Sequence, residues 1–324
     1  MCQHHDMHTV IKKSRHRLEL PLFFLTAFLT IATFLVVLAL SFYKQETLEF
    51  TQDITVAQYR DAHKEAKGMT DTQILDSLSE DERELIGYVE RINPLLVLLA
   101  PVGFLLLIIY QIGKLYGGVR ADGVRVGPNQ FGEVYKIWAE MAQKLGLKKT
   151  PELYIQNGSG ALNAFATCLP GYRSFGVVYS DILERALANN DEKSLRFILG
   201  HELGHVRYNH VTWWYNMLNI IGNMPGFNYI IGMPLSRSRE YGCDKLGAML
   251  SEDTEQRGLL MLAAGKHLYR QVNAEAYYAE HVYNRSYWGA VSNFFNDHPS
   301  INWRISALQQ NKHGSLIWDN GKKK

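Results

Sequence analysis

Cysteine is scarce in this chain of 324 residues, and neither sign of charge dominates. The three cysteines, Cys2, Cys168 and Cys243, show no paired spacing, which argues against a disulfide framework and favours a reducing compartment. The 34 basic residues nearly balance the 32 acidic ones, so no overall field predicts nucleic acid as a partner. A content of 47% hydrophobic and 20% charged residues fits neither a disordered chain nor one wholly embedded in a membrane.

Charge is absent or nearly absent from two long stretches. Residues 21–43, PLFFLTAFLTIATFLVVLALSFY, are uncharged and exceed the roughly 20 apolar residues with which a helix crosses a bilayer. A cleaved signal peptide is the alternative, although the apolar run is longer than a usual signal core. Residues 92–113 predict a second span, in which Pro101 is tolerated where neighbouring groups satisfy the backbone. A buried helix of a soluble domain is the alternative for this stretch.

Basic residues flank the two stretches on their outer sides. They are Lys12, Lys13, Arg15 and Arg17 before the first stretch and Lys114, Arg120 and Arg125 after the second. The intervening residues 44–92 are rich in aspartate and glutamate. The positive-inside rule then predicts an integral membrane protein with two spans, with both termini and everything after residue 113 in the cytoplasm, as in a bacterial inner membrane. The acidic loop 44–92 would lie on the other side.

Four parts follow along the chain. Residues 1–19 form a basic tail, expected to be disordered, although His4, His5 and His8 could make a weak metal site. Residues 20–113 form the transmembrane hairpin, 114–129 a linker, and 130–324 a folded domain. The terminal GKKK is expected to be a solvated tail near anionic lipid.

The folded domain alternates short strands with longer helices. Strands are predicted at 151–157, 161–168 and 174–180, and helices at 131–146, 181–188, 191–208, 254–281 and near 302–310. We therefore predict an α+β fold that is mostly helical, with one small sheet beside the helix at 191–208.

That helix carries the motif HELGH at residues 201–205. Residues four apart lie on one face of a helix, so His201 and His205 can present two imidazoles to one metal while Glu202 reaches a metal-bound water. A catalytic zinc usually takes three protein ligands and keeps one position for water. Two histidines are therefore insufficient, and a third ligand is needed.

A second pair at helical spacing supplies that ligand. Glu240 would complete a His2Glu set for one zinc ion per chain, and Asp244 could accept a hydrogen bond from the free ring nitrogen of a ligand histidine. The alternative is a solvated helix face, because Arg237, Arg239 and Lys245 lie nearby. Cys243 receives no metal role, because Glu240 already completes the set.

Four segments in order, NAFAT (163–167), LGHELGHV (199–206), SRSREYGCD (236–244) and DHPSINWRI (297–305), resemble the HtpX-like membrane zinc endopeptidases, which are related to the CAAX prenyl endopeptidases. The resemblance covers residues 130–310. It implies a zincin-type catalytic domain with zinc ligands at His201, His205 and Glu240, Glu202 as the general base, and Asp244 behind the ligands. It also implies site-supporting residues at His298 and Arg304. The substrate-binding edge strand that it implies is Asn163, Ala164, Phe165 and Ala166.

His298 and Arg304 have further interpretations. His298 could donate to the oxyanion of the reaction, or be a capping or core histidine before Pro299. Arg304 could anchor Asp244 or another carboxylate, or touch substrate.

The chain departs from the family between the two motifs. Residues 206–239 are too polar and interrupted for the two further spans that HtpX-like proteins typically have there. Trp213 and Trp214 with the segment FNYIIGMPL suggest a hydrophobic flap or a segment lying against the membrane. A buried helical hairpin is the alternative.

Two functions fit these observations. The first is a membrane-anchored, gluzincin-like zinc endopeptidase that cleaves unfolded or membrane proteins, with membrane-protein quality control as the role that the resemblance implies. The second is a membrane-anchored zinc protein that binds clients without cleaving them, for which the long acidic loop is the motive. The intact Glu202 favours the first, since a structural zinc site needs no base. The lipid bilayer is an expected partner, and the oligomeric state stays open.

Overall fold

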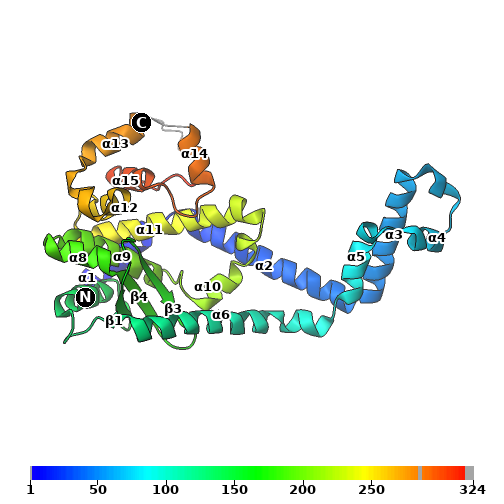
Figure 1. Cartoon of the computed structure of the whole chain (residues 1–324), viewed down its shortest axis with the longest axis horizontal. Coiled ribbons are helices and arrows are strands. Elements are labelled where there is room, and N and C mark those ends of the chain that lie inside the picture. The colour runs from blue at the N-terminus through cyan, green and yellow to red at the C-terminus, as the bar shows by residue number, and fades with distance from the viewer. Residues whose placement is uncertain (1, 284–286, 318–324) are drawn as a thin grey trace. The chain divides into compact units, whose positions relative to one another are not determined.

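The computed structural model describes residues 2–283 and 287–317 (Figure 1). The chain divides into two compact units, a larger one of residues 1–28 and 107–324 and a smaller one of residues 29–106. Two long helices, α2 (Glu19–Phe42) and α6 (Pro94–Asp122), each contribute residues to both units. Both helices are long and apolar enough to cross a membrane. None of the most apolar part of α6 is buried, which speaks against the alternative of a soluble core helix.

The smaller unit is helical, although its sequence is polar. It contains α3 (Lys44–Ala62), the 3-10 turn η1 (Lys64–Gly68), α4 (Asp71–Ser77) and α5 (Glu80–Arg91). Capping boxes begin α4 at Thr70 and α5 at Ser79. Its own small core comprises Val56, Ala66, Ile74, Leu78 and Ile86. The acidic segment 44–92 is thus a folded helical module.

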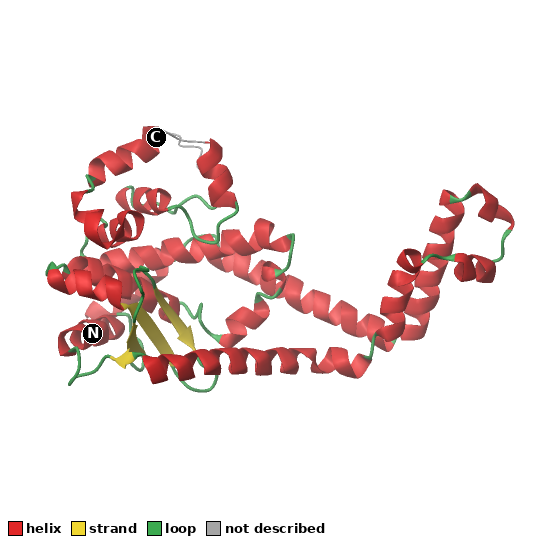
Figure 2. Ribbon diagram, in the orientation of Figure 1, coloured by secondary structure: helices red, strands yellow, loops and turns green. Residues whose placement is uncertain are grey.

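The larger unit combines a four-stranded sheet with many helices, which confirms the predicted α+β fold (Figure 2). Up to the motif helix, its elements are α1 (Cys2–Ser14), β1 (Val124–Arg125), α7 (Gly132–Lys144), β2 (Glu152–Gln156), β3 (Ala164–Cys168), β4 (Ser174–Tyr179), α8 (Ser180–Ala188) and α9 (Glu192–Arg207). The rest are α10 (Trp213–Leu218), η2 (Ile221–Asn223), η3 (Asn228–Gly232), α11 (Met233–Ser251), α12 (Arg257–Leu268), η4 (Tyr269–Gln271), α13 (Ala274–Tyr283), α14 (Tyr287–Phe294) and α15 (Ile301–Gln309).

The sheet has the strand order β1-β2-β4-β3. Strand β2 pairs parallel with β4, and β1 and β3 pair antiparallel with their neighbours. Successive side chains of a strand point to opposite faces, so Leu153 and Ile155 join the main core with α7, α8 and α9. Tyr154 lies on the other face against Tyr116 and Val119 of α6. Strand β3 is therefore left at one edge of the sheet.

The end of α6 occupies residues that were expected to form a linker. The helix continues to Asp122, and Tyr116 and Val119 are buried against the sheet. Side chains added at Gly117 and Gly118 of this helix would meet no neighbour, so packing does not require glycine at either position. Residues 123–131, which include the short strand β1, then connect α6 to α7.

Two further expectations differ from the structure. The predicted helix 254–281 is divided into α12, η4 and α13, and Gly265, with a φ of +79°, breaks the helical path within α12 itself. The N-terminal tail was expected to be disordered, and that was wrong: α1 is a helix whose Ile11 is buried in the main core. The side chains of His4 and His5, and the final GKKK, lie outside the described residues.

Segments from both ends of the chain pack on α9 and α11. The Tyr208 hydroxyl donates to the Ile11 carbonyl (2.8 Å), and His16 Nε2 bonds to the Gly314 carbonyl (3.1 Å). Arg237 of α11 is fully buried and donates to the carbonyls of Leu316, Asn293 and Asn296. The larger unit consequently combines the N-terminal segment through the start of α2 with the sequence from the end of α6 onward.

Candidate metal centre

Helix α9 holds the motif histidines with a rigid backbone. Asp191 caps its start, where Oδ1 accepts from the Ser194 amide (3.2 Å). One side of the helix packs in the main core. Its buried residues there are Leu195, Phe197, Ile198, Leu199 and Leu203. His201 and His205, one turn apart, consequently point to a shared side, toward α11.

Small residues let α9 and α11 approach closely. A methyl group added at Gly200 would lie 3.2 Å from the Gly247 Cα, and one at Gly204 would lie 3.1 Å from Cys243 Sγ. No larger side chain separates the two backbones there. Because the two helices lie so close together, the Glu240 carboxylate on α11 reaches both imidazoles on α9.

Three ligand atoms converge at this crossing. The Nε2 atoms of His201 and His205 are 3.2 Å apart, and each lies 3.3 Å from an oxygen of Glu240. Ligands held about 2.0–2.2 Å from one tetrahedral ion stand roughly 3.3 Å from one another. The structure thus brings together the three side chains predicted as metal ligands, and their separations and donor types fit a metal ion.

Asp244 and Arg304 form a buried network behind the histidine. His201 Nδ1 lies 2.9 Å from Asp244 Oδ1. The Arg304 guanidinium donates a hydrogen bond to each oxygen of Asp244, at 2.8 and 2.5 Å. Arg304 also lies 3.5 Å from Glu240. Burial alone would raise the pKa of Asp244, but the charge and hydrogen bonds of Arg304 outweigh it and hold that pKa below its usual value. The helix face of Glu240 and Asp244 is therefore buried, and the solvated-face alternative is wrong.

A pocket of about 170 Å³ opens beside the ligands. It is lined by His201, Glu202, Glu240, His298 and Arg304, by Leu162, Asn163 and Ala164 at the start of β3, and by Phe197, Ile198 and Leu262. Burial raises the pKa of the Glu202 carboxyl above its ordinary value. The pocket thus gathers a carboxyl group, the ligand set and one end of a strand edge.

His298 stands at the rim of this pocket. Its Nε2 lies 3.6 Å from Glu240 Oε1, and its Nδ1 lies 2.9 Å from Asp297 Oδ1. The side chain is 59% exposed, so the alternative of a core histidine is wrong. An exposed imidazole beside the ligand set can reach a group that enters the pocket.

Strand β3 presents a free edge at the pocket. Tyr179 donates to the Asn163 carbonyl, which makes residues 163 and 179 a hydrogen-bonded pair of the β3–β4 ladder. Hydrogen-bonded and non-bonded pairs alternate in an antiparallel ladder, so Phe165 also bonds to β4. The backbone groups of Ala164 and Ala166 therefore point away from β4, toward an edge on which the described residues place no strand.

Sequence reasoning missed two residues beside the ligands, His210 and Glu19. His210 Nδ1 lies 3.1 Å from His205 Nδ1, and His210 Nε2 lies 3.0 Å from Glu19 Oε1. His210 stands five residues after His205, beyond the end of α9, where helical spacing no longer predicts its direction. Glu19 is distant in sequence, and no spacing signal connects it to the site.

The segment between the two motifs is neither a membrane hairpin nor a fully buried one. Tyr215, Ile221 and Ile231 are buried. Large apolar side chains on the same segment are exposed, namely Trp213, Trp214, Met224, Phe227, Tyr229 and Ile230. A mixture of buried anchors and exposed apolar groups fits a flap better than the buried hairpin.

Comparisons with known proteins agree with this site. The chain matches the family model "Peptidase family M48" over residues 128–217 and 215–312. It is 29% identical over 167 residues to the plastoglobule-localized metallopeptidase 48 of Arabidopsis thaliana, covering 48% of this chain and 47% of that protein. This chain thus spans about half the length of that relative.

Bacterial relatives match over more of their length. A protease HtpX homologue of Helicobacter acinonychis is 23% identical over 228 residues, 58% of this chain and 70% of its own length. Protease HtpX of Acinetobacter baylyi is 27% identical over 213 residues, 53% and 69% respectively. No solved structure matches this chain.

These matches confirm the resemblance to HtpX-like membrane proteases that the four segments predicted. The family match covers more than half of the chain and contains all three residues of the metal-ligand cluster. The chain belongs to peptidase family M48, a family of metallopeptidases.

Proposed function

We propose that this protein is a membrane-anchored, zinc-dependent endopeptidase with one zinc ion held by His201, His205 and Glu240. The observation that carries the proposal is the pocket in which this His2Glu set, the Glu202 carboxyl and the start of a free strand edge meet. Two imidazoles and one carboxylate with an open position are the ligands of gluzincin-like catalytic zinc. The same ligands also accept other divalent metals, so zinc is the finer part of the proposal.

Each residue of the pocket has a role in peptide hydrolysis. Bound zinc supplies a Lewis acid that polarises a carbonyl and lowers the pKa of water. Glu202 accepts a proton from the attacking water at a carboxylate oxygen and donates it to the leaving amine as the C–N bond breaks. His298 donates a hydrogen bond to the oxygen of the former carbonyl. Asp244, gripped by Arg304, orients the His201 ring through its Nδ1–H.

The free edge of β3 selects extended peptides. An extended chain can add to a sheet edge through main-chain hydrogen bonds, and here the outward groups of Ala164 and Ala166 begin at the pocket wall. Binding of this kind reads the backbone and not the side chains, so unfolded segments are the expected substrates. Asn163 to Ala166 is the proposed substrate-binding stretch.

Substituting Ala166 by proline tests this edge, because it removes one outward N–H and leaves the β4 ladder intact. We expect kcat/KM for an unfolded protein to fall by about 2- to 10-fold, the value of one hydrogen bond of 0.5–1.5 kcal/mol. Ala166→Ser keeps the N–H and is the matched control. Equal kcat/KM values for the two variants, at equal metal content, would show that substrate does not pair there.

The proposed anchor is a hairpin of two spans, residues 20–113, with the metallopeptidase domain 130–324 on the cytoplasmic side. Residues before α2 and residues after α6 pack in one unit through contacts such as Tyr208 with Ile11. This packing supports the proposal that the two flanks lie on the same side of a membrane, with an even number of crossings between them. The basic flanking residues favour the cytoplasmic side.

Retention of the first apolar helix has support of its own. Glu19 is fully buried against His210, and Phe23 stacks on Tyr215 with ring centroids 4.2 Å apart. Cleavage after a signal core would remove these partners from the metal centre. The exposed aromatic groups between residues 213 and 230 favour substrates presented at a membrane surface, in agreement with the proposed role in membrane-protein quality control.

The test is cleavage of an unfolded, casein-like protein by the full-length protein in detergent, before and after chelation. We expect fragments that disappear when the metal is removed and return when zinc is restored. The alternative of a client-binding zinc protein predicts a complex with the unfolded protein and no fragments at any zinc concentration. Fragments that persist undiminished in chelator would contradict a metallopeptidase and indicate a contaminant.

A further inference from the structure

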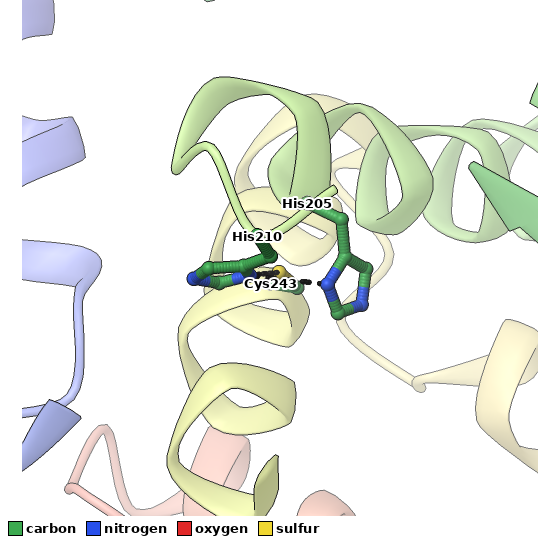
Figure 3. A group of neighbouring side chains, drawn as sticks. All are labelled: His205, His210 and Cys243. Atoms are coloured by element: carbon green, nitrogen blue, oxygen red, sulfur yellow. Dashed lines mark hydrogen bonds between the residues drawn. The ribbon is translucent and has the colours of Figure 1, made fainter. Parts of the chain in front are cut away.

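A second group of ligand atoms lies directly behind the metal centre. His205, His210 and Cys243 come from α9, from the turn after it and from α11, and their Nδ1, Nδ1 and Sγ atoms face one another (Figure 3). This set shares His205 with the first site but uses the opposite nitrogen of its ring. Neither His210 nor Cys243 has a part in the proposed hydrolysis.

The separations within this group fit a metal ion. The two Nδ1 atoms are 3.1 Å apart, and Cys243 Sγ lies 3.9 Å from His210 Nδ1. Around a tetrahedral ion with bonds of about 2.0 Å to nitrogen and 2.3 Å to sulfur, the corresponding separations are roughly 3.3 and 3.6 Å. Both separations lie within a few tenths of an ångström of these values, and all three atoms lie within 4.8 Å of one another.

The surroundings prepare His210 as a ligand. Glu19 Oε1 lies 3.0 Å from His210 Nε2, so the carboxylate can hold the ring proton on Nε2 and leave the Nδ1 lone pair directed at the group. Arg15 bridges to the same carboxylate at 3.3 Å. A carboxylate behind a histidine ring is the arrangement that also supports His201 in the first site.

Burial fixes the geometry of the group. Cys243 is fully buried and His210 nearly so, whereas His205 is partly exposed. The His205 ring therefore separates this group from the open side of the first site.

We propose that His205 Nδ1, His210 Nδ1 and Cys243 Sγ form a second metal site for a thiophilic divalent ion such as Zn²⁺, Co²⁺ or Cd²⁺. Binding breaks the S–H bond of Cys243 and releases its proton to solvent as the metal–sulfur bond forms. When both sites are filled, His205 binds one ion through each ring nitrogen and also loses its Nδ1 proton. The thiolate distinguishes this site from the His2Glu site, which contains no sulfur.

The spectrum of bound cobalt tests this assignment without reference to cleavage. Metal-free full-length protein in detergent is titrated with Co²⁺, and a thiolate-to-cobalt charge-transfer band in the near ultraviolet is expected. Cys243→Ala should abolish that band and keep the weaker visible bands of cobalt at the first site. Cys168→Ala, which removes a cysteine outside the group, should leave all bands unchanged.

Two results would overturn the second site. The first is the absence of a sulfur band from the parental protein at saturating Co²⁺. The second is a band of parental intensity in Cys243→Ala protein. Retained first-site bands and an unchanged circular dichroism spectrum establish that the variant is folded, and alanine is small enough for the contact with Gly204.

A functional consequence follows if the proposed peptidase activity holds, on which it rests. An ion at the second site takes the Nδ1 of His205 and so changes the charge and position of the ring that holds the first ion through Nε2. Excess zinc should therefore inhibit cleavage by the parental protein and by Cys168→Ala. Cys243→Ala should resist that inhibition by at least a fewfold in zinc concentration. Loss of activity in all variants would bear on the proposed function alone, because the cobalt spectrum reports the second site separately.

Discussion

Glu202→Gln protein is expected to cleave an unfolded substrate about 10²- to 10⁴-fold more slowly than the parent, the usual contribution of a general base. Glutamine has nearly the same shape, but its amide cannot accept the proton of the attacking water or pass it to the leaving amine. The carboxyl group lies in the pocket beside the ligands and takes no part in the three-atom cluster. Metal content should therefore stay at the parental value, measured by elemental analysis of the same preparation.

A matched control is available on the same helix. Glu192→Gln changes an exposed glutamate in the first turn of α9, which pairs only with Arg196 among the described contacts of its side chain, and it should retain parental activity. Glu202→Gln protein that holds its metal and still cleaves at the parental rate would remove Glu202 from the mechanism. Loss of both metal and activity would instead assign Glu202 a structural role.

Arg304→Met should lower both stability and metal affinity. The guanidinium is buried and binds Asp244 through two hydrogen bonds, and it also lies near Glu240. Its removal leaves buried carboxylates without their cation, which typically costs about 3–5 kcal/mol. Because Asp244 then no longer fixes the His201 ring, metal affinity should fall by about 10- to 100-fold. Denaturant unfolding in detergent and competition with a chromophoric chelator measure the two effects.

Two variants separate the contributions of charge and geometry. Arg304→Lys keeps the charge but loses the two-pronged contact, so it should recover part of the stability and little of the metal affinity. Arg257→Ala removes an arginine whose ion pair with Glu255 is partly exposed and lies apart from the Asp244 network, so it should change neither quantity by much. Metal affinity of Arg304→Met equal to that of the parent would mean that Asp244 orients His201 without help.

The ligand cluster could be predicted because its members lie on two regular helices. His201 and His205 on one helix, and Glu240 on another, follow spacings that place them on single faces. The strands β2, β3 and β4 were likewise predicted from alternation and bounding glycines, and the structure confirms them. Resemblance to a known family then supplied Arg304, for which local spacing offers no signal.

Other features depend on backbone turns that periodicity cannot detect. Asn209 adopts a φ of +65° just after α9 and turns the chain back, which places the His210 ring behind His205. Gly265 breaks the helix expected over 254–281 in a comparable way. The N-terminal helix was missed because its composition is polar and one apolar residue such as Ile11 does not predict burial. Ile11 is buried against a surface formed by distant sequence.

The division of the larger unit around two apolar helices also dictates its order of assembly. Ile11, Glu19 and His16 are synthesised well before their partners Tyr208, His210 and Gly314, which follow both apolar helices in the sequence. At about 5–20 residues per second, the interval between Glu19 and His210 alone is roughly 10 to 40 seconds. During that interval Ile11 and Glu19 lack the partners Tyr208 and His210 that they contact in the folded unit. The surroundings of His210 are therefore completed only after sequence that follows both apolar helices has been made.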